Sequence, residues 1–317
     1  MMSPRSWRLA GRGASVFALV TSLVLFLAPS AQAASFAVNH GGLSPTVQAA
    51  APELQVLGPS GLTVGNEAVF LADPLARRVI EYGRDLRPRR AWPFDLAPQD
   101  VLQTTNGQLC AIDAAAERLE CRASASAPGP SVTRRLRAGA GALVSGPSGA
   151  LWALRGDGFA GPAWGAEALV HALPMSRAPR WQAAGMWRGA ERLEVLLWPW
   201  SARPDDKGVE PSRTLAFAPP PGLRAGSVRP LRMDAAGRLY VALEWLGGTR
   251  QLEVLQQVAR VDAKGRRAVV QWLAASYAPG LQDFDVDAAG GVWRLYHTPG
   301  LVHLEALPTS AWREVAR

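Results

Sequence analysis

The stretch Asp234-Ala-Ala-Gly237-Arg-Leu-Tyr240-Val-Ala is a glycine turn followed by an apolar and aromatic strand, and Asp287-Ala-Ala-Gly290-Gly-Val-Trp293-Arg-Leu repeats it. Weaker copies are Gly146-Pro-Ser-Gly149-Ala-Leu-Trp152-Ala-Leu and Thr105-Asn-Gly107-Gln-Leu-Cys110-Ala-Ile. A phrase that recurs about every forty residues indicates an array of similar structural units. The repeat therefore predicts the fold class before any single element is assigned.

The strands that follow these turns are spaced evenly along the chain. Their centres, 40 to 53 residues apart, are Phe70, Cys110, Trp152, Val195, Tyr240 and Trp293. Such a unit accommodates four short antiparallel strands with their turns. Adjacent residues such as Leu239 and Tyr240 are both apolar, which favours sheets packed on sheets over an open sandwich. We predict an all-β chain, a six-bladed β-propeller.

The last two units show their strands most clearly. The fifth has strands near Pro230–Met233, Arg238–Trp245, Leu252–Val261 and Ala268–Leu273. The sixth has strands near Leu281–Val286, Val292–Tyr296 and Leu301–Leu307. A fourth strand is needed there, because a ring that does not close exposes its edges. Either Glu53–Leu57 or Trp312–Val315 could supply it, and we favour the former because the first full repeat starts just after it.

The N-terminal residues have the composition of an export signal. Arg5, Arg8 and Arg12 precede an apolar run over Ala14–Ala28, and Ala31-Gln32-Ala33 offers the small residues that a signal peptidase reads. The run is shorter than the roughly 20 residues of a spanning helix, and no cysteine follows it for lipid attachment. We predict a cleavable signal peptide over 1–33, a flexible lead-in over 34–52 and the propeller over 53–317. An uncleaved anchor is the alternative.

Export would place a soluble protein in the periplasm or outside the cell, with no transmembrane segment after signal cleavage. The formal net charge is +8, from 34 Lys and Arg against 26 Asp and Glu, and part of the excess lies in the predicted signal. That charge is too small to indicate a nucleic-acid-binding protein. The sequence also lacks the Gly-x-Ser-x-Gly, His-Glu-x-x-His, phosphate-loop and dinucleotide motifs, which argues against the common hydrolases.

The stretch Leu71-Ala-Asp73-Pro-Leu-Ala-Arg-Arg78-Val-Ile-Glu-Tyr82 resembles the NHL-repeat pattern of an apolar pair, Asp, a short turn, Arg and alternating apolar residues. Ala111-Ile-Asp113-Ala-Ala-Ala-Glu-Arg118-Leu-Glu-Cys121 keeps the same spacing. The resemblance implies a six-bladed propeller of the NHL, gluconolactonase and strictosidine-synthase-like type. It is good in units one, two, five and six, and it speaks for fold more than for function.

The chain has two cysteines, Cys110 and Cys121. If their hairpin pairs Asp113 with Arg118, the cysteines lie opposite each other, with Cβ atoms about 4.5–5.5 Å apart. An oxidising compartment then favours a disulfide, with two buried thiols as the alternative. The loop that such a disulfide closes is short, so the bond would stabilise one hairpin more than the whole fold.

In related propeller enzymes, carboxylates and amides at the starts of the innermost strands hold a Ca²⁺-like metal, because hard cations need several oxygen ligands. The matching positions here are Ser60, Asp100, Ala142, Gln182, Pro230 and Asp283. Ala142 and Pro230 offer no side-chain ligand, so the family's Glu/Asn/Asn/Asp set is not reproduced. We favour a structural role in which the aspartates accept backbone N–H groups at strand starts. A Ca²⁺ or ligand site at Ser60, Asp100, Gln182 and Asp283 is the alternative.

Two further groups of side chains could carry function. A basic surface patch is expected from Arg84, Arg87, Arg89, Arg90, Arg134, Arg135 and Arg137, which lie near the outer strands of units one and two. It could bind anionic lipid headgroups, lipopolysaccharide or an acidic protein, although charged edge strands also prevent aggregation, which we favour. His297 and His303 could meet across a hairpin, but no third metal ligand is evident.

These observations favour a non-catalytic binding or scaffold module for a protein or cell-envelope ligand, and no metal or cofactor is predicted for it. The alternative is a metal-dependent, lactonase-like hydrolase with a divalent cation at the tunnel mouth.

Overall fold

The computed structural model of the chain describes residues 32–37, 43–46, 58–123, 131–146, 149–155, 160–164, 173–174, 181–201, 209–234, 236–248, 252–273, 282–298, 301–307 and 309–315. Strands dominate these residues, which confirms the all-β prediction. Within them, no helix has the length and apolar character needed to cross a bilayer.

The described strands form six antiparallel sheets, which we number I to VI along the chain. Sheet VI comes last, although one of its strands lies near the N-terminus. Sheet I contains β2 (Gly61–Val64), β3 (Ala68–Asp73), β4 (Arg78–Gly83) and β5 (Pro88–Pro93). Sheet II contains β6 (Asp100–Gln103), β7 (Leu109–Asp113), β8 (Arg118–Arg122) and β9 (Val132–Arg135). Sheet III contains β10 (Ala140–Ser145), β11 (Leu151–Arg155) and β12 (Ala160–Pro162).

The C-terminal half supplies the other three sheets. Sheet IV contains β13 (Leu173–Pro174), β14 (Trp181–Trp187), β15 (Leu193–Pro199) and β16 (Arg213–Phe217). Sheet V contains β17 (Arg224–Met233), β18 (Leu239–Gly247), β19 (Glu253–Val261), β20 (Arg267–Leu273) and β24 (Arg313–Val315). Sheet VI contains β21 (Phe284–Val286), β22 (Val292–Thr298), β23 (Leu301–Leu307) and β1 (Gln32–Ala37). The strands predicted for units five and six correspond to strands of sheets V and VI, but β17 begins at Arg224, earlier than the predicted Pro230.

The outer strand of sheet VI differs from the prediction. β1 pairs with β23, from Gln32 opposite Ala306 to Ala37 opposite Leu301. The strand does come from the N-terminal side, but from an earlier segment than Glu53–Leu57, which lies outside the described residues.

Trp312–Val315 is not the outer strand of sheet VI, because β24 pairs with β20 in sheet V instead. The anchor is Trp312, whose ring lies 5.7 Å from that of Tyr240 and whose Nε1 donates to the Gly290 carbonyl. This side chain directs the tail to sheet V.

Apolar side chains pack the sheets against one another. Leu239 belongs to a cluster shared by sheets III, IV and V, whereas the adjacent Tyr240 belongs to a cluster shared by sheets V and VI. Leu71 and Trp293 meet in a further cluster between sheets I and VI. Both faces of these strands are therefore buried, as the apolar runs predict.

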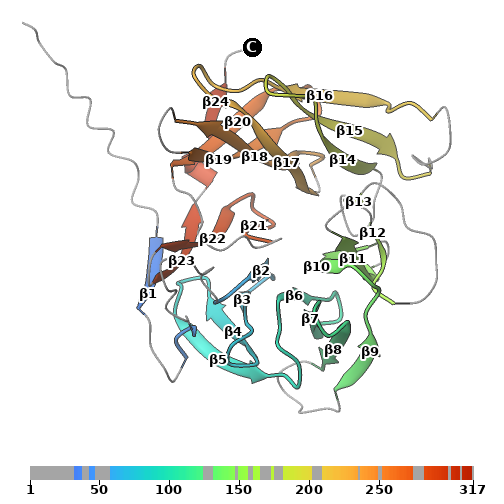
Figure 1. The fold of residues 1–317 in the computed structure, drawn as a ribbon, viewed down its shortest axis with the longest axis vertical. Coiled ribbons are helices and arrows are strands. Elements are labelled where there is room, and N and C mark those ends of the chain that lie inside the picture. The colour runs from blue at the N-terminus through green and yellow to red at the C-terminus, as the bar shows by residue number, and fades with distance from the viewer. Residues whose placement is uncertain are drawn as a thin grey trace, which may run out of the picture. The chain divides into compact units, whose positions relative to one another are not determined.

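The first strands of sheets I, II, III, V and VI and the second strand of sheet IV contact strands of neighbouring sheets (Figure 1). β2 contacts β6 and β21, β6 contacts β10, and β17 contacts β14 and β21. A parallel bridge joins Gly61 to Gln282, and the Leu62 N–H donates to the Gln282 carbonyl at 3.1 Å. Sheets III and IV share an apolar cluster. Polar residues at the starts of these strands are thereby brought close, although they are distant in sequence.

The repeated phrase is one turn with a fixed set of hydrogen bonds. Asp234 Oδ1 accepts the N–H groups two and four residues later, and its Oδ2 accepts the Tyr240 hydroxyl at 3.0 Å. Asp287 makes the same bonds, with Trp293 Nε1 at 3.2 Å in place of the hydroxyl. Gly237 has a φ of +73°, a conformation that only glycine adopts readily.

The predicted cysteine hairpin is also present. Cys110 lies opposite Cys121 on β7 and β8, and a disulfide joins them. The register that predicted this pairing, Asp113 opposite Arg118, is observed as well.

Candidate functional site

Asp100 connects three sheets near the start of β6. Its side chain is buried, and its Oδ2 accepts the Leu143 N–H of β10 at 2.6 Å. With its amide nitrogen turned toward Asp100, Gln282 donates to Oδ2 at 2.7 Å and to Oδ1 at 3.0 Å. The Asp100 carboxyl group thus connects β6 of sheet II to β10 of sheet III and to Gln282, which precedes β21 of sheet VI.

Burial governs the protonation of this carboxyl group and of two others nearby. It raises the pKa of Asp100 to about 8, and hydrogen bonds from the Leu143 and Val101 N–H groups oppose the rise. Burial also raises the pKa of Asp283 and of Asp285, against the nearby guanidinium groups of Arg229 and Arg232 respectively. The three carboxyl groups hold protons more tightly than exposed ones do.

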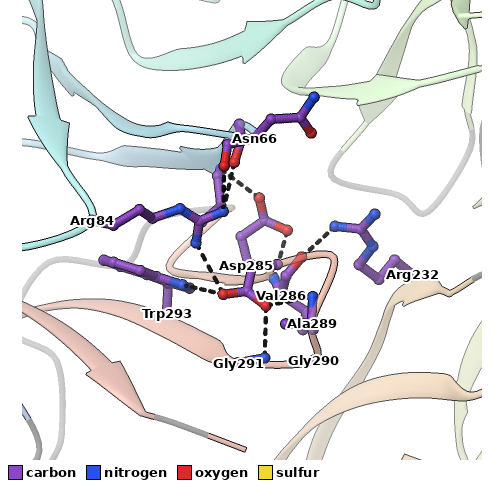
Figure 2. A network of polar contacts seen from close by, with 12 residues as sticks. Asn66, Arg84, Arg232, Asp285, Val286, Ala289, Gly290, Gly291 and Trp293 are labelled. Carbon is purple, nitrogen blue, oxygen red and sulfur yellow. Dashed lines mark hydrogen bonds and ion pairs between the residues drawn. The ribbon is translucent and has the colours of Figure 1, made fainter.

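Asp283 and Asp285 also connect sheets. Asp283 forms an ion pair with Arg229 of β17, and Asp285 Oδ2 accepts the Val64 N–H of β2 at 2.7 Å. Arg232 of sheet V donates to the Val286 carbonyl. In Figure 2, Arg232 approaches Val286 from one side, while Asp285 points toward the strand of sheet I. Sheet VI is therefore held by polar contacts to both of its neighbours.

The remaining predicted positions are Ser60 and Gln182. Ser60 Oγ donates to the Gln99 carbonyl at 2.7 Å, just before β6. Gln182 is buried in β14, and its Nε2 donates to the Pro199 carbonyl of its own sheet at 3.2 Å. Within the described residues there is no group of three or more His, Cys, Asp and Glu side chains that could hold a metal ion.

Arg84 enters a network between sheets I and VI instead of facing outward (Figure 2). Its Nη1 lies 2.9 Å from Asp287 Oδ2, and its Nη2 donates to the carbonyls of Gly65 and Asn66. Its guanidinium carbon lies 5.2 Å from the centre of the Trp293 ring. Arg84 was predicted to be part of the basic surface patch. It belongs instead to the contact between sheets I and VI.

Sheet V shows why sheet VI needs an arginine from elsewhere. There, Asp234 forms an ion pair with Arg238, four residues later in the same turn. The residue four after Asp287 is Gly291, which has no side chain to offer. Arg84 of sheet I occupies the equivalent position on the Asp287 carboxylate.

Several other arginines of the predicted patch have acidic partners. Arg87 pairs with Asp85, Arg90 with Glu81 and Arg135 with Glu117. The Arg134 guanidinium stacks over Trp164, 4.8 Å from the ring centre. These pairs reduce the local positive charge. Arg89 is exposed, and no described acidic residue forms an ion pair with it.

A polar cleft of about 320 Å³ lies between sheets I and II, at the ends of β2 and β6 opposite to Ser60 and Asp100. Its lining includes Glu81, which is 5% exposed and whose Oε2 accepts Arg90 Nε at 2.5 Å and Trp92 Nε1 at 3.1 Å. This cleft was not predicted from the sequence. The available signal was Glu81, a carboxylate inside the otherwise apolar and buried part of β4.

The two histidines do not meet. His297 lies opposite Val302, and His303 lies opposite Tyr296, so their side chains point to opposite faces of sheet VI. Burial lowers the pKa of His297 to about 4, and the His303 ring stacks on Tyr296 with centres 4.4 Å apart. A metal site shared by the pair is not supported by this register.

No protein-family model matches the chain, and no curated protein matches it in sequence. Solved structures with a similar fold include a streptogramin B lyase, 12% identical, with a TM-score of 0.44 over 83% of this chain and 98% of that one. The calcium-binding protein regucalcin from Agrobacterium tumefaciens is 13% identical, with a TM-score of 0.43 over 80% of this chain and 92% of that one. A gluconolactonase from Xanthomonas campestris is 13% identical, with a TM-score of 0.43 over 87% of this chain and 98% of that one.

Identities and TM-scores this low carry no conclusion about activity.

Proposed function

We propose that the protein is an exported, six-bladed β-propeller that binds a polar ligand or a protein of the cell envelope without catalysing a reaction. The six sheets are its blades, and contacts between β21 and β2 close the ring. Residues 1–33 are removed as a signal peptide, which leaves Ala34–Ala37 of β1 to complete the sixth blade. Loops and clefts between blades, and not the axis, supply the binding surface.

This proposal rests on the hydrogen bonds and the ion pair that the carboxyl groups of Asp100 and Asp283 make with other strands. A metal-dependent hydrolase needs several oxygen atoms that converge on its cation. Here Asp100 accepts hydrogen bonds from Leu143 and Gln282, and Asp283 pairs with Arg229. These oxygens serve as ties between strands, whereas the cleft between sheets I and II presents polar groups to solvent.

The test uses the chain that begins at Ala34. We expect it to sediment with an isolated cell-envelope fraction in a saturable manner, and we expect added CaCl₂ to leave its melting temperature unchanged. Absence of saturable sedimentation would overturn the binding role.

The metal-dependent alternative is tested with Asp100→Ala and Asp283→Ala, and Asp262→Ala serves as the control on an outer turn. The quantity compared is the calcium-dependent shift, because the substitutions alter stability by themselves. A ligand at 100 times its Kd stabilises a protein by about 2.7 kcal/mol. A calcium-dependent stabilisation of that order that is lost in Asp100→Ala and Asp283→Ala but kept in Asp262→Ala would overturn our proposal. It would favour the metal-dependent hydrolase instead.

A further inference from the structure

The cleft between sheets I and II is formed by three short segments. They are the turn between β2 and β3, the strand β5, and the turn between β6 and β7. Its lining includes Asn66, Glu67, Arg89, Arg90, Trp92 and Thr105. Its floor is made by Glu81 together with apolar residues such as Phe70.

A β-bulge brings two arginines to this cleft. Arg90 lies opposite Glu81, but Tyr82 lies opposite Pro88, so Arg89 is an extra residue in β5. Consecutive residues of a regular strand point to opposite faces. A bulge can redirect a side chain, and here both Arg89 and Arg90 line the same cleft.

Glu81 holds one of these guanidinium groups in place. Its buried carboxylate accepts Arg90 Nε and Trp92 Nε1, and the Arg90 guanidinium carbon lies 4.5 Å from the centre of the Trp92 ring. The Nε donor of Arg90 is thus occupied, while 45% of its side chain remains exposed. The planar group is fixed on an aromatic surface, and such a group recognises carboxylate and phosphate oxygens well.

The rest of the lining is mainly polar and partly exposed. Thr105, Asn66 and Glu67 are exposed side chains on the two turns, and they offer hydroxyl, amide and carboxylate groups. Sites for hydrophobic molecules are lined mainly by apolar residues, which does not describe this cleft. Its volume of about 320 Å³ suits one small polar molecule.

We infer that this cleft binds an acidic sugar unit, whose anionic group contacts Arg89 and Arg90 and whose hydroxyl groups face Thr105, Asn66 and Glu67. The inference rests on the proposed binding role and adds its location and ligand class. The anion can be a carboxylate or a phosphate, since guanidinium groups bind both.

Calorimetric titration of the chain from Ala34 tests this inference with glucuronate, glucose 6-phosphate and glucose as probes. We expect at least one of the two acidic sugars to bind with a Kd of about 1 mM or below, and the neutral sugar to bind at least tenfold more weakly. The stronger acidic probe identifies the source of the anion.

The variant Arg89→Gln should weaken acidic-sugar binding about tenfold, because it removes an exposed cation that no described acidic residue pairs with. The matched control is Arg87→Gln, on the same exposed segment but outside the lining of the cleft. Its affinity should not change. Equal loss in both variants, or equal binding of glucose and the acidic sugars, would overturn the inference.

Sedimentation with the envelope fraction separates this inference from the proposed function. If wild type and Arg89→Gln sediment equally while neither acidic sugar binds, the binding role stands and this cleft is not its site. If poly-glutamate binds, depends on Arg89 and the sugars do not bind, the ligand is an acidic protein and the sugar assignment is wrong. If nothing sediments and no probe binds, both proposals fail together.

Discussion

Asp287 illustrates how one side chain can belong to a turn and to a contact between sheets. Its Oδ1 caps two N–H groups of its own turn, while its Oδ2 accepts bonds from Trp293 and from Arg84 of sheet I. The carboxylate is 15% exposed. Because buried polar groups left without partners are costly, removal of Asp287 should affect the turn and the contact at once.

Asp287→Ala should lower the free energy of unfolding by about 2–3 kcal/mol, measured by urea titration. Asp262→Ala is a matched control, because Asp262 makes the same turn bonds but its arginine partner, Arg266, is 66% exposed. The control should lose less than half as much stability. Equal losses in the two variants would mean that the contact with sheet I contributes nothing.

Asp100 should make stability depend on pH. Its pKa is about 8 in the folded protein, against an ordinary value of 3.8. The folded state therefore keeps a proton that the unfolded state releases, and stability falls as the pH rises from about 4 to about 8. The stabilisation that Asp100 contributes by holding this proton is fully present below about pH 4 and is lost once the pH exceeds about 8.

Asp100→Asn cannot ionise and should lack this slope. Between about pH 5 and pH 8, the wild type should lose stability relative to the variant by up to about 1.4 kcal/mol per pH unit. Urea titrations at several pH values measure the difference, and the contributions of Asp283 and Asp285 cancel because both proteins contain them. A difference that stays constant over this range would show that Asp100 is ionised in the folded protein.

The sequence predicts some of these roles and not others. The sequence places Asp100 near the start of an inner strand, but its bond from the Leu143 N–H, in the middle of β10, depends on how two sheets pack. Arg84 could not be assigned to Asp287, since 203 residues separate them and only the packed fold brings them together. The cleft was missed for the same reason, because the bulge that redirects Arg89 depends on its pairing with β4.

At the scale of elements, alternation and turns locate most strands. The strands β18, β19 and β22 of sheets V and VI are predicted within a few residues, because Asp-x-x-Gly turns mark their ends. The outer strand of sheet VI is not, because closure pairs β23 with a segment more than 260 residues away. Local patterns do not specify a partner at that distance.

β1 provides a direct test at this scale. A chain that begins at Ala34 keeps four of the six pairs with β23, whereas a chain that begins at Val38 keeps none. Within Leu301–Ala306, we expect the alternate amide hydrogens that face β1 to exchange about tenfold faster in the shorter chain, because this side of β23 becomes an edge. Those that face β22 should change less. Amides of β19, which is an inner strand of another sheet, serve as the internal control. Unchanged exchange in β23 would show that β1 does not pair with it in solution.

At the scale of the whole molecule, the proposed ring makes each sheet depend on two neighbours. The contact between sheets VI and I is the one that joins the two ends of the array. It contains the Gly61–Gln282 bridge, the bond from Val64 to Asp285 and the Arg84 network. Without this contact the sheets would form an open array, and its terminal sheets would be free to unfold first.

Asp285→Ala distinguishes a closed ring from an open array. The substitution leaves the Val64 N–H without its acceptor and should lower the free energy of unfolding by about 1–3 kcal/mol. In a closed ring the urea transition stays single, and tryptophan fluorescence and circular dichroism coincide, because loss of one contact weakens all sheets together. The control is Asp85→Ala, whose carboxylate is 61% exposed, pairs with the exposed Arg87 and accepts the N–H of the same residue at 3.2 Å. Because these contacts lie within one exposed turn, its midpoint should move much less than that of Asp285→Ala. Two separate transitions in Asp285→Ala would contradict closure, since sheets I and VI would then unfold while the others remain folded.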